Sequence, residues 1–265
     1  MTLVAHDVHL AYDHRTVVHG VDFAVPAGLV TVIVGANGCG KSTLLRGLGR
    51  ILRPTRGRVE LDGQDLRGLR PRDVATEVGL LPQQPCAPEG ITVGDLVGRG
   101  RHPHQSAFRR WCAADAEAVS RALALTDTHD LVGRRVEELS GGQRQRVWIA
   151  MMLAQDPRIM LLDEPTTYLD IAHQVEVLDL LAELNGERDT TVVMVLHDLN
   201  LAARYAHHLV VMADGRILRS GTPAEVLDVD CVREAFGLES RVIADPVAGC
   251  PMVVPIRRAY KVSLT

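Results

Sequence analysis

The chain has few aromatic residues and no long apolar segment. Phe, Trp and Tyr make up 3% of its 265 residues, which argues against a stacking platform for single-stranded nucleic acid. No apolar run approaches the roughly 18–20 residues that a membrane-spanning helix needs. The formal net charge of −4 gives no strong general attraction to nucleic acid or anionic lipid. We therefore expect a globular protein with no nucleic-acid partner.

Cysteine pairs and metal-ligand clusters are also missing. The five cysteines are odd in number, scattered and without C-x-x-C spacing, which predicts a reduced, cytosolic protein with no disulfide frame. The first twelve residues lack the basic and apolar segments of a secretory signal. His102 and His104, and His207 and His208, form two pairs without a second ligand pair at metal-site spacing. We interpret them as surface histidines.

One glycine-rich segment stands between a predicted strand, residues 30–34, and a predicted helix. Residues 35–43 read GANGCGKST and match the phosphate-binding pattern G-x-x-x-x-G-K-[ST]. Glycines let backbone N–H groups approach phosphate oxygens, and a helix N-terminus adds unpaired donors. Lys41 is expected to reach the β- and γ-phosphates, and the Ser42 hydroxyl to bind Mg²⁺. A turn without a ligand is the alternative, but Lys-Ser in register favours a nucleotide site. The predicted nucleotide-binding residues are Asn37, Gly38, Cys39, Gly40, Lys41, Ser42 and Thr43.

The order of predicted elements indicates an α/β fold. Two antiparallel strands, 3–10 and 16–25, precede strand–loop–helix units with buried strands near 78–81, 159–162 and 190–196. Residues 86–156 are predicted to form a mainly helical insertion. The chain then reads as one domain, with a core of residues 1–85 and 157–225 and a small C-terminal extension, 226–265. Ligands of parallel sheets lie at the carboxyl ends of the strands.

Polar residues follow three of these strands. Asp163 and Glu164 end a fully apolar strand, where unpaired charge is costly unless it has a partner. We assign Asp163 to Mg²⁺ and Glu164 to polarising an attacking water. Gln83 could bind Mg²⁺ or that water, and His197 could contact the γ-phosphate. A solvated strand end for the carboxylates, an ordinary loop glutamine and a packed or capping histidine are the alternatives.

A second glycine pair begins another predicted helix. Residues 139–143 are Leu139, Ser140, Gly141, Gly142 and Gln143, and S-x-x-Q is also a capping box. The capping box explains Ser140 and Gln143 but leaves the two glycines unexplained, because glycine weakens a helix start. Two glycines at a helix N-terminus suggest a second anion site. A single nucleotide does not need both sites from one chain.

Taken together, these motifs resemble the ATP-binding subunits of ABC transporters over almost the whole chain. In family terms, residues 35–43 match Walker A, Gln83 the Q-loop and residues 139–143 the signature motif. Residues 159–164 match Walker B, residues 167–170 the D-loop with Asp170, and His197 the switch histidine. Tyr12 matches the aromatic residue that stacks on adenine. The resemblance implies a P-loop NTPase (RecA-like) core with an antiparallel β subdomain and an inserted helical subdomain. It further implies ATP and Mg²⁺ as cofactors and a dimer with a second copy, whose signature motif acts in trans.

Shorter strings resemble the ATPases of iron-siderophore importers, the ferric-enterobactin type most of all. This resemblance implies separate transmembrane permease subunits, an indirectly associated substrate-binding protein and no direct contact with the substrate. It places the protein on the cytoplasmic face of the cell membrane, with a membrane subunit docked near Gln83 and residues 85–110. Haem or cobalamin uptake is the alternative. The strings are Leu80–Gln84, Glu89–Val93, Gly100–Pro103, Glu164–Ile171 and Asp245–Gly249.

Other classes with the same cassette fit less well. A chromosome or DNA-repair ATPase carries a long coiled coil between Walker A and the signature motif, whereas 99 positions without sustained heptads separate Lys41 from Ser140. A translation-factor cassette and a catalytically inactive scaffold are disfavoured, because there is one cassette and its chemical residues are all present. Cys39 replaces the serine or alanine that the family leads us to expect. A thiol at a helix N-terminus is expected to have a lowered pKa.

Overall fold

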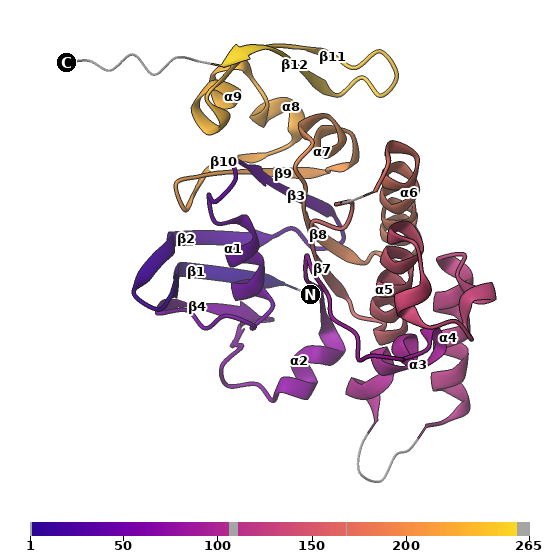
Figure 1. Cartoon of the computed structure of the whole chain (residues 1–265). Coiled ribbons are helices and arrows are strands. Elements are labelled where there is room, and N and C mark those ends of the chain that lie inside the picture. The colour runs from indigo at the N-terminus through magenta and orange to yellow at the C-terminus, as the bar shows by residue number, and fades with distance from the viewer. Residues whose placement is uncertain (1, 106–110, 168, 259–265) are drawn as a thin grey trace. The chain divides into compact units, whose positions relative to one another are not determined.

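The computed structural model describes residues 2–105, 111–167 and 169–258 (Figure 1). They divide into two compact units, the first from Met1–Leu66 and Val193–Thr265 and the second from Arg67–Val192. Strand β8 (Thr191–Val195) carries the chain across this boundary. Among the described residues, none of the helices combines the length and hydropathy of a membrane-spanning segment.

The first unit contains a four-stranded sheet in the order β2-β1-β4-β5. Strand β1 (Leu3–Tyr12) pairs antiparallel with β2 (Arg15–Val25) and β4 (Arg56–Leu61), and β5 (Gln64–Asp65) closes a hairpin at the edge. The strands alternate buried apolar and exposed residues, as expected for a sheet with one covered face. The predicted antiparallel strands are therefore confirmed.

The phosphate-loop segment follows strand β3 (Val30–Gly35), whose six residues are all buried. Strand β3 pairs in parallel with β9 (His208–Ala213), and β10 (Arg216–Gly221) returns antiparallel to β9. Helix α1 (Lys41–Leu48) lies against β1 (Figure 1). The approach is close: a Cβ on Gly47 would lie 2.6 Å from Leu10 Cδ1.

The C-terminal part of the first unit follows helix α7 (Leu199–Tyr205), whose N-cap is Asp198. The described chain ends with α8 (Pro223–Val226), α9 (Val229–Phe236) and the antiparallel strands β11 (Leu238–Ala244) and β12 (Pro251–Arg258). Asn200 connects α7 to β12, because its side-chain amide donates to the Val253 carbonyl (3.3 Å) and accepts from the Val253 N–H (2.8 Å).

The second unit contains the helical segments predicted at 86–156. They are α3 (Val93–Gly98), η1 (Arg99–His104), α4 (Ala113–Leu125), η2 (His129–Leu131), η3 (Val136–Glu138) and α5 (Gly141–Gln155). Here β6 (Val78–Leu81) pairs in parallel with β7 (Ile159–Asp163), and α6 (Ile171–Arg188) follows. The end of β6 therefore lies beside the end of β7.

A buried ion pair connects η1, α4 and α5. Arg101 Nε lies 3.0 Å from Asp115 Oδ1, and Arg101 Nη1 donates to the Ala154 carbonyl at 2.7 Å. Burial by itself raises the pKa of Asp115, but hydrogen bonds from Arg101 and Cys112 outweigh it and hold that pKa below its usual range. The Gly100–Pro103 string, read from the sequence only as kinship, thus contains a packing determinant of the helical unit.

Helix α2 (Pro71–Glu77) is not among the elements predicted from the sequence. It has proline in its first turn, and Asp73 accepts from Arg70. The two histidine pairs lie at the surface, as expected: one residue of each pair, His102 and His207, is exposed and the other is half-buried. Two of these histidines also contact the backbone. His104 Nε2 lies 2.7 Å from the Gln155 carbonyl, and the Val30 N–H donates to His207 Nδ1 at 3.1 Å. No group of three potential ligands for a metal ion occurs in the described part of the chain.

Candidate functional site

The loop after β3 has the shape of a cradle for an anion. Gly40, the residue before α1, has a left-handed backbone (φ 104°) and no side chain with which to cap the helix. A Cβ on Gly38 would meet nothing within 4 Å. The Cys39 N–H donates to the Ala36 carbonyl at 3.2 Å, which closes the loop. Phosphate oxygens are suitable acceptors for the N–H groups at such a helix start.

Lys41 lies across this loop. Its side chain is buried, and Nζ donates to the carbonyls of Gly35 (2.9 Å) and Ala36 (3.1 Å). These two carbonyls hold the ammonium group at the loop. A phosphate oxygen is a better partner for the ammonium group than a neutral carbonyl, because the hydrogen bond then joins two charged groups.

The prediction of a lowered pKa for the Cys39 thiol is wrong. Cys39 is 7% exposed, and burial raises the pKa of its thiol, outweighing the opposing influence of Lys41. The Asp214 carboxylate also raises it. The helix N-terminus was the visible signal in the sequence, whereas the burial of Cys39 was not visible there.

Two further predicted residues belong to the first unit. His197 is exposed and follows Leu196, whose N–H donates to the Ile33 carbonyl of β3 at 3.2 Å. It thus lies at the edge of the sheet from which the phosphate loop leaves. Tyr12 is 40% exposed at the end of β1, and its hydroxyl accepts from Arg46 Nη1 at 3.1 Å. An adenine could stack on a ring that is accessible in this way.

The second unit brings Gln83 and Glu164 together, as their positions after parallel strands predicted. Gln83 Nε2 donates to Glu164 Oε2 at 2.6 Å. Glu164 has a left-handed backbone (φ 56°), which is uncommon for a residue other than glycine and often marks a functional position. It is 9% exposed. The carboxylate is held in one place and keeps limited access to solvent, as a residue that polarises water requires.

Thr167 also holds Glu164, which the sequence analysis did not foresee. Its hydroxyl donates to Glu164 Oε2 at 3.0 Å, and its N–H donates to the Glu164 carbonyl at 3.3 Å. The sequence placed Thr167 only within the D-loop string. A hydroxyl three residues after a carboxylate in a turn was the signal that could have suggested this contact. Tyr168 of the same string lies outside the described residues.

The donor set of the second unit fits Mg²⁺. Asp163 ends β7 with a side chain that is almost fully buried. The hydrogen bond from Gln83 to Glu164 uses the amide NH₂, so the amide oxygen keeps its capacity to coordinate. Mg²⁺ prefers carboxylate, carbonyl and hydroxyl oxygens. Asp163 and Gln83 would supply oxygen ligands from this unit, and the bound ion would neutralise phosphate charge.

The helix that carries the second glycine pair begins with a complete capping box. Ser140 Oγ accepts from the Gln143 N–H (3.2 Å), and Gln143 Oε1 accepts from the Ser140 N–H (3.1 Å). The capping-box interpretation is therefore confirmed. It does not remove the anion-site interpretation, because the Ser140 hydroxyl accepts here and can still donate its proton to a phosphate oxygen.

A contact with α6 accounts for one of these two glycines. A Cβ on Gly142 would lie 3.2 Å from Cδ2 of the His173 ring. Asp170 caps α6 by accepting from the His173 N–H (3.0 Å), and it also lies 2.8 Å from His173 Nδ1. These contacts lower the pKa of Asp170. The D-loop aspartate thus lies one side chain away from the signature motif.

Known proteins share this set of features. Residues 18–167 match a family model described as ABC transporter; this range contains the phosphate loop, Gln83, residues 139–143 and Glu164. The protein named "Probable siderophore transport system ATP-binding protein" from Bacillus subtilis (strain 168) is 52% identical over 93% of this chain and 90% of its own length. The ferric enterobactin transport ATP-binding protein of Escherichia coli (strain K12) is 49% identical over 94% and 92%. A solved structure described as an inward-facing, metal-chelate type transporter matches with a TM-score of 0.82 and 28% identity, over 98% of both chains.

Proposed function

The chain belongs to the ABC transporter family, and from this premise we propose that it hydrolyses ATP to power the import of iron-siderophore complexes across the cell membrane. The substrate class rests on the two relatives that are about half identical over nearly their full lengths. The chemistry rests above all on one observation, the contact of Gln83 with a buried Glu164 at the ends of adjacent parallel strands.

We assign each site residue a part in the reaction. In the first unit, the loop N–H groups and Lys41 bind the phosphates and hold them in place. In the second, Glu164 orients a water and takes up its proton, while Gln83 and Thr167 fix the carboxylate. Mg²⁺ bound by Ser42, Gln83 and Asp163 would supply positive charge to the phosphate oxygens. His197 would contact the γ-phosphate, and Tyr12 the adenine.

The second anion site supports a dimer with a second copy of the chain. Residues 139–143 begin α5 with a serine hydroxyl able to donate and two glycines. We assign these residues to the γ-phosphate of the ATP bound by the second copy, with Asp170 at the same interface. The family supports dimeric cassettes bound to transmembrane permeases, and hence a peripheral place at the membrane. A substrate-binding protein would act through the permease, and the chelate would not touch this chain.

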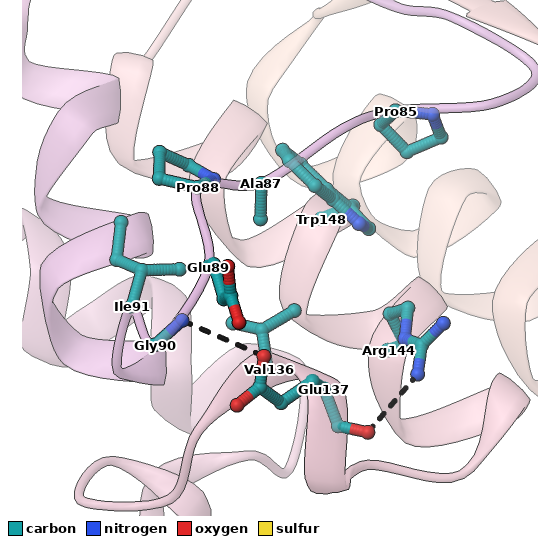
Figure 2. A pocket seen from close by; sticks show the side chains of 10 residues that line it. All are labelled: Pro85, Ala87, Pro88, Glu89, Gly90, Ile91, Val136, Glu137, Arg144 and Trp148. Carbon is teal, nitrogen blue, oxygen red and sulfur yellow. Dashed lines mark hydrogen bonds between the residues drawn. The ribbon is translucent and has the colours of Figure 1, made fainter.

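A pocket in the second unit is our candidate for permease contact (Figure 2). It encloses about 170 Å³ beside residues 85–91, within the 85–110 range expected from the sequence; residues 106–110 lie outside the described part. Pro85, Pro88 and Ile91 give it an apolar wall, and Arg144 donates to the Glu137 carbonyl at its rim (3.4 Å). We propose that it receives an apolar side chain from the permease. A cysteine at Pro88 should then cross-link to the permease, and a lack of any cross-link would count against this placement.

The function is tested by uptake in a strain from which the gene has been deleted. Restoring the wild-type chain should restore uptake of labelled iron-siderophore complexes, and Lys41→Ala should not. The purified variant should bind MgATP about 100-fold more weakly or worse, because an ammonium-to-phosphate contact is worth up to ~3 kcal/mol. Unchanged affinity would remove the phosphate-loop assignment.

Haem and cobalamin in the same uptake assay address the alternative substrate class. Restored uptake of either one, with no siderophore uptake, would replace the iron-siderophore proposal but keep the ATPase. A panel of iron chelates of different chemistry would then identify the cargo.

A further inference from the structure

The turn between β9 and β10 is bonded to the phosphate loop and to β2 at the same time. The Gly215 N–H donates to the Cys39 carbonyl at 3.1 Å. The Gly215 carbonyl accepts from the His19 N–H at 2.9 Å. One residue of a hairpin turn therefore bridges two segments that are far from it in the sequence.

Backbone crowding shows how tightly the turn is placed. A Cβ on Gly215 would lie 2.2 Å from the Val17 carbonyl oxygen, much closer than any real contact, and its φ of +74° also suits glycine. The other end of the loop meets the same hairpin, because a Cβ on Gly35 would lie 2.2 Å from the Met212 carbonyl oxygen. Strand β9 and its turn thus back the phosphate loop at both ends.

A second turn in the chain shows that these contacts are not a property of Asp-Gly turns in general. Asp62-Gly63 has the same dipeptide and a glycine φ of +76°, yet a Cβ on Gly63 would meet nothing within 4 Å. Both turns need a residue that tolerates positive φ. Only Gly215 also needs a missing side chain so that another backbone can approach.

The bond to Cys39 has a consequence for the loop's donors. The peptide group is planar and trans, so the Cys39 carbonyl and the Gly40 N–H point in opposite directions. Fixing the carbonyl toward Gly215 therefore fixes the Gly40 N–H away from the turn. That N–H belongs to the glycine-rich loop whose donors we assign to the nucleotide phosphates.

We propose that Gly215 is a positioning residue for ATP binding: it sets the orientation of the Cys39–Gly40 peptide in the phosphate loop. The proposal rests on the nucleotide site described above, which it extends to a residue outside the phosphate-binding pattern. Gly215 touches no nucleotide itself. It acts through the Cys39 carbonyl and through its packing against Val17.

Gly215→Ala tests this, with Gly63→Ala as the matched control. Both substitutions place alanine at the same positive φ in an Asp-Gly turn. MgADP should bind Gly215→Ala at least tenfold more weakly and Gly63→Ala within twofold of the wild-type chain. The KM for ATP should rise in Gly215→Ala while kcat stays within threefold. A Kd for Gly215→Ala within twofold of wild type would overturn the proposal.

Hydrogen exchange on the unmodified chain provides a second test if Gly215→Ala does not fold. MgADP should slow exchange of the Gly215 amide at least threefold, together with the loop amides. The Asp62 amide, which donates to the Thr2 carbonyl at 2.9 Å in the other turn, should not change. Slowing of the loop amides without the Gly215 amide would sink the proposal. A wild-type chain that binds no MgADP would instead refute the nucleotide site.

Discussion

Among the described helices, α1 and α5 both have glycines at their starts, and the two starts are built differently. Helix α1 begins after Gly40, a left-handed residue with no capping side chain, and backbone atoms of other segments lie close to Gly35 and Gly40 of the loop. Helix α5 begins after Ser140, an extended residue whose side chain forms a complete capping box. Near Gly142 the crowding comes from the His173 ring.

The difference indicates how each start can respond to a ligand. The loop before α1 is held by backbone contacts with the β9–β10 hairpin, so we expect it to keep its shape when a nucleotide binds. The start of α5 is held by its own side chains, whose hydrogen bonds can be exchanged for bonds to a phosphate at little net cost. A preformed primary site and an adjustable second site suit a nucleotide that binds one copy first and joins a second copy later.

Glu164→Gln gives the largest expected effect and tests whether the two starts act on one nucleotide. Loss of a proton-accepting carboxylate should lower ATP turnover about 100- to 1,000-fold. ATP binding should persist, and a dimer should accumulate on size-exclusion chromatography in MgATP.

Adding Ser140→Ala should weaken that trapped dimer if α5 contributes to it. Glu183 is exposed on α6, so Glu183→Gln is the control. Its ATP turnover and its dimer formation should match those of the wild type. Wild-type turnover in Glu164→Gln would exclude Glu164 as the base.

Asp115→Asn should have the next largest effect, on stability rather than turnover. It leaves the Arg101 charge buried without its partner and should cost about 3 kcal/mol of unfolding free energy, measured by urea denaturation. Arg101 also donates to Ala154 in the last turn of α5, so the change loosens the helix whose start carries the signature motif.

The contribution of Asp115 to the free energy of unfolding depends on pH, because its pKa is lowered in the folded chain. Its stabilising effect is complete above the ordinary aspartate pKa of about 4 and is lost as the pH falls through the lower folded value. The difference between wild type and Asp115→Asn should therefore shrink in acid. Asp130→Asn, at an exposed position, should change little; a difference that grows in acid would contradict this account.

Gly142→Ala should reduce ATP turnover by a smaller factor, about tenfold, because a single side chain can move by a few tenths of an ångström to relieve the contact. Removing the ring in Gly142→Ala/His173→Ala should restore part of the loss. No such rescue is available at Gly35, where the obstacle is the Met212 backbone. Equal losses in the single and double variants would show that His173 is not what excludes a side chain there.

The smallest expected effect is slow alkylation of Cys39. The raised pKa keeps its thiol protonated near neutral pH, and the protonated thiol is a poor nucleophile. Iodoacetamide at pH 7.5 should modify exposed Cys86 at least tenfold faster, measured by peptide mass spectrometry. The Cys39 rate should keep rising above pH 9, and any contribution of its neutral form to stability is lost over the same range. Equal alkylation rates for Cys39 and Cys86 at pH 7.5 would instead favour the lowered thiol pKa expected from the sequence.

Local signals predicted most of the fold. The antiparallel strands β1 and β2 and the apolar runs of β3 and β7 all lie where the sequence placed them. Helix α2 was missed, although its proline and first-turn aspartate are helix-start signals.

The features of the site also divide into those that the sequence predicted and those that it did not. The loop residues and the pairing of Gln83 with Glu164 follow from motif and strand order. The contacts of Thr167, His173 and Arg101, and the burial of Cys39, depend on which surfaces pack together. No short pattern contains that information. The predicted domain boundaries, the roles of the site residues and the signature motif acting in trans stay predictions.

Gly47 carries a consequence for anyone who would stabilise this protein by design. Replacing glycine with alanine inside a helix is a standard improvement, worth up to about 1 kcal/mol in helix propensity. Here the added methyl group would lie 2.6 Å from Leu10 Cδ1, so either the buried Leu10 side chain or α1 must shift. The helix starts at Lys41, and a shift along its length would move the lysine as well. A design that replaces Gly47 with alanine for its helix propensity would therefore disturb the packing of the helix that carries Lys41.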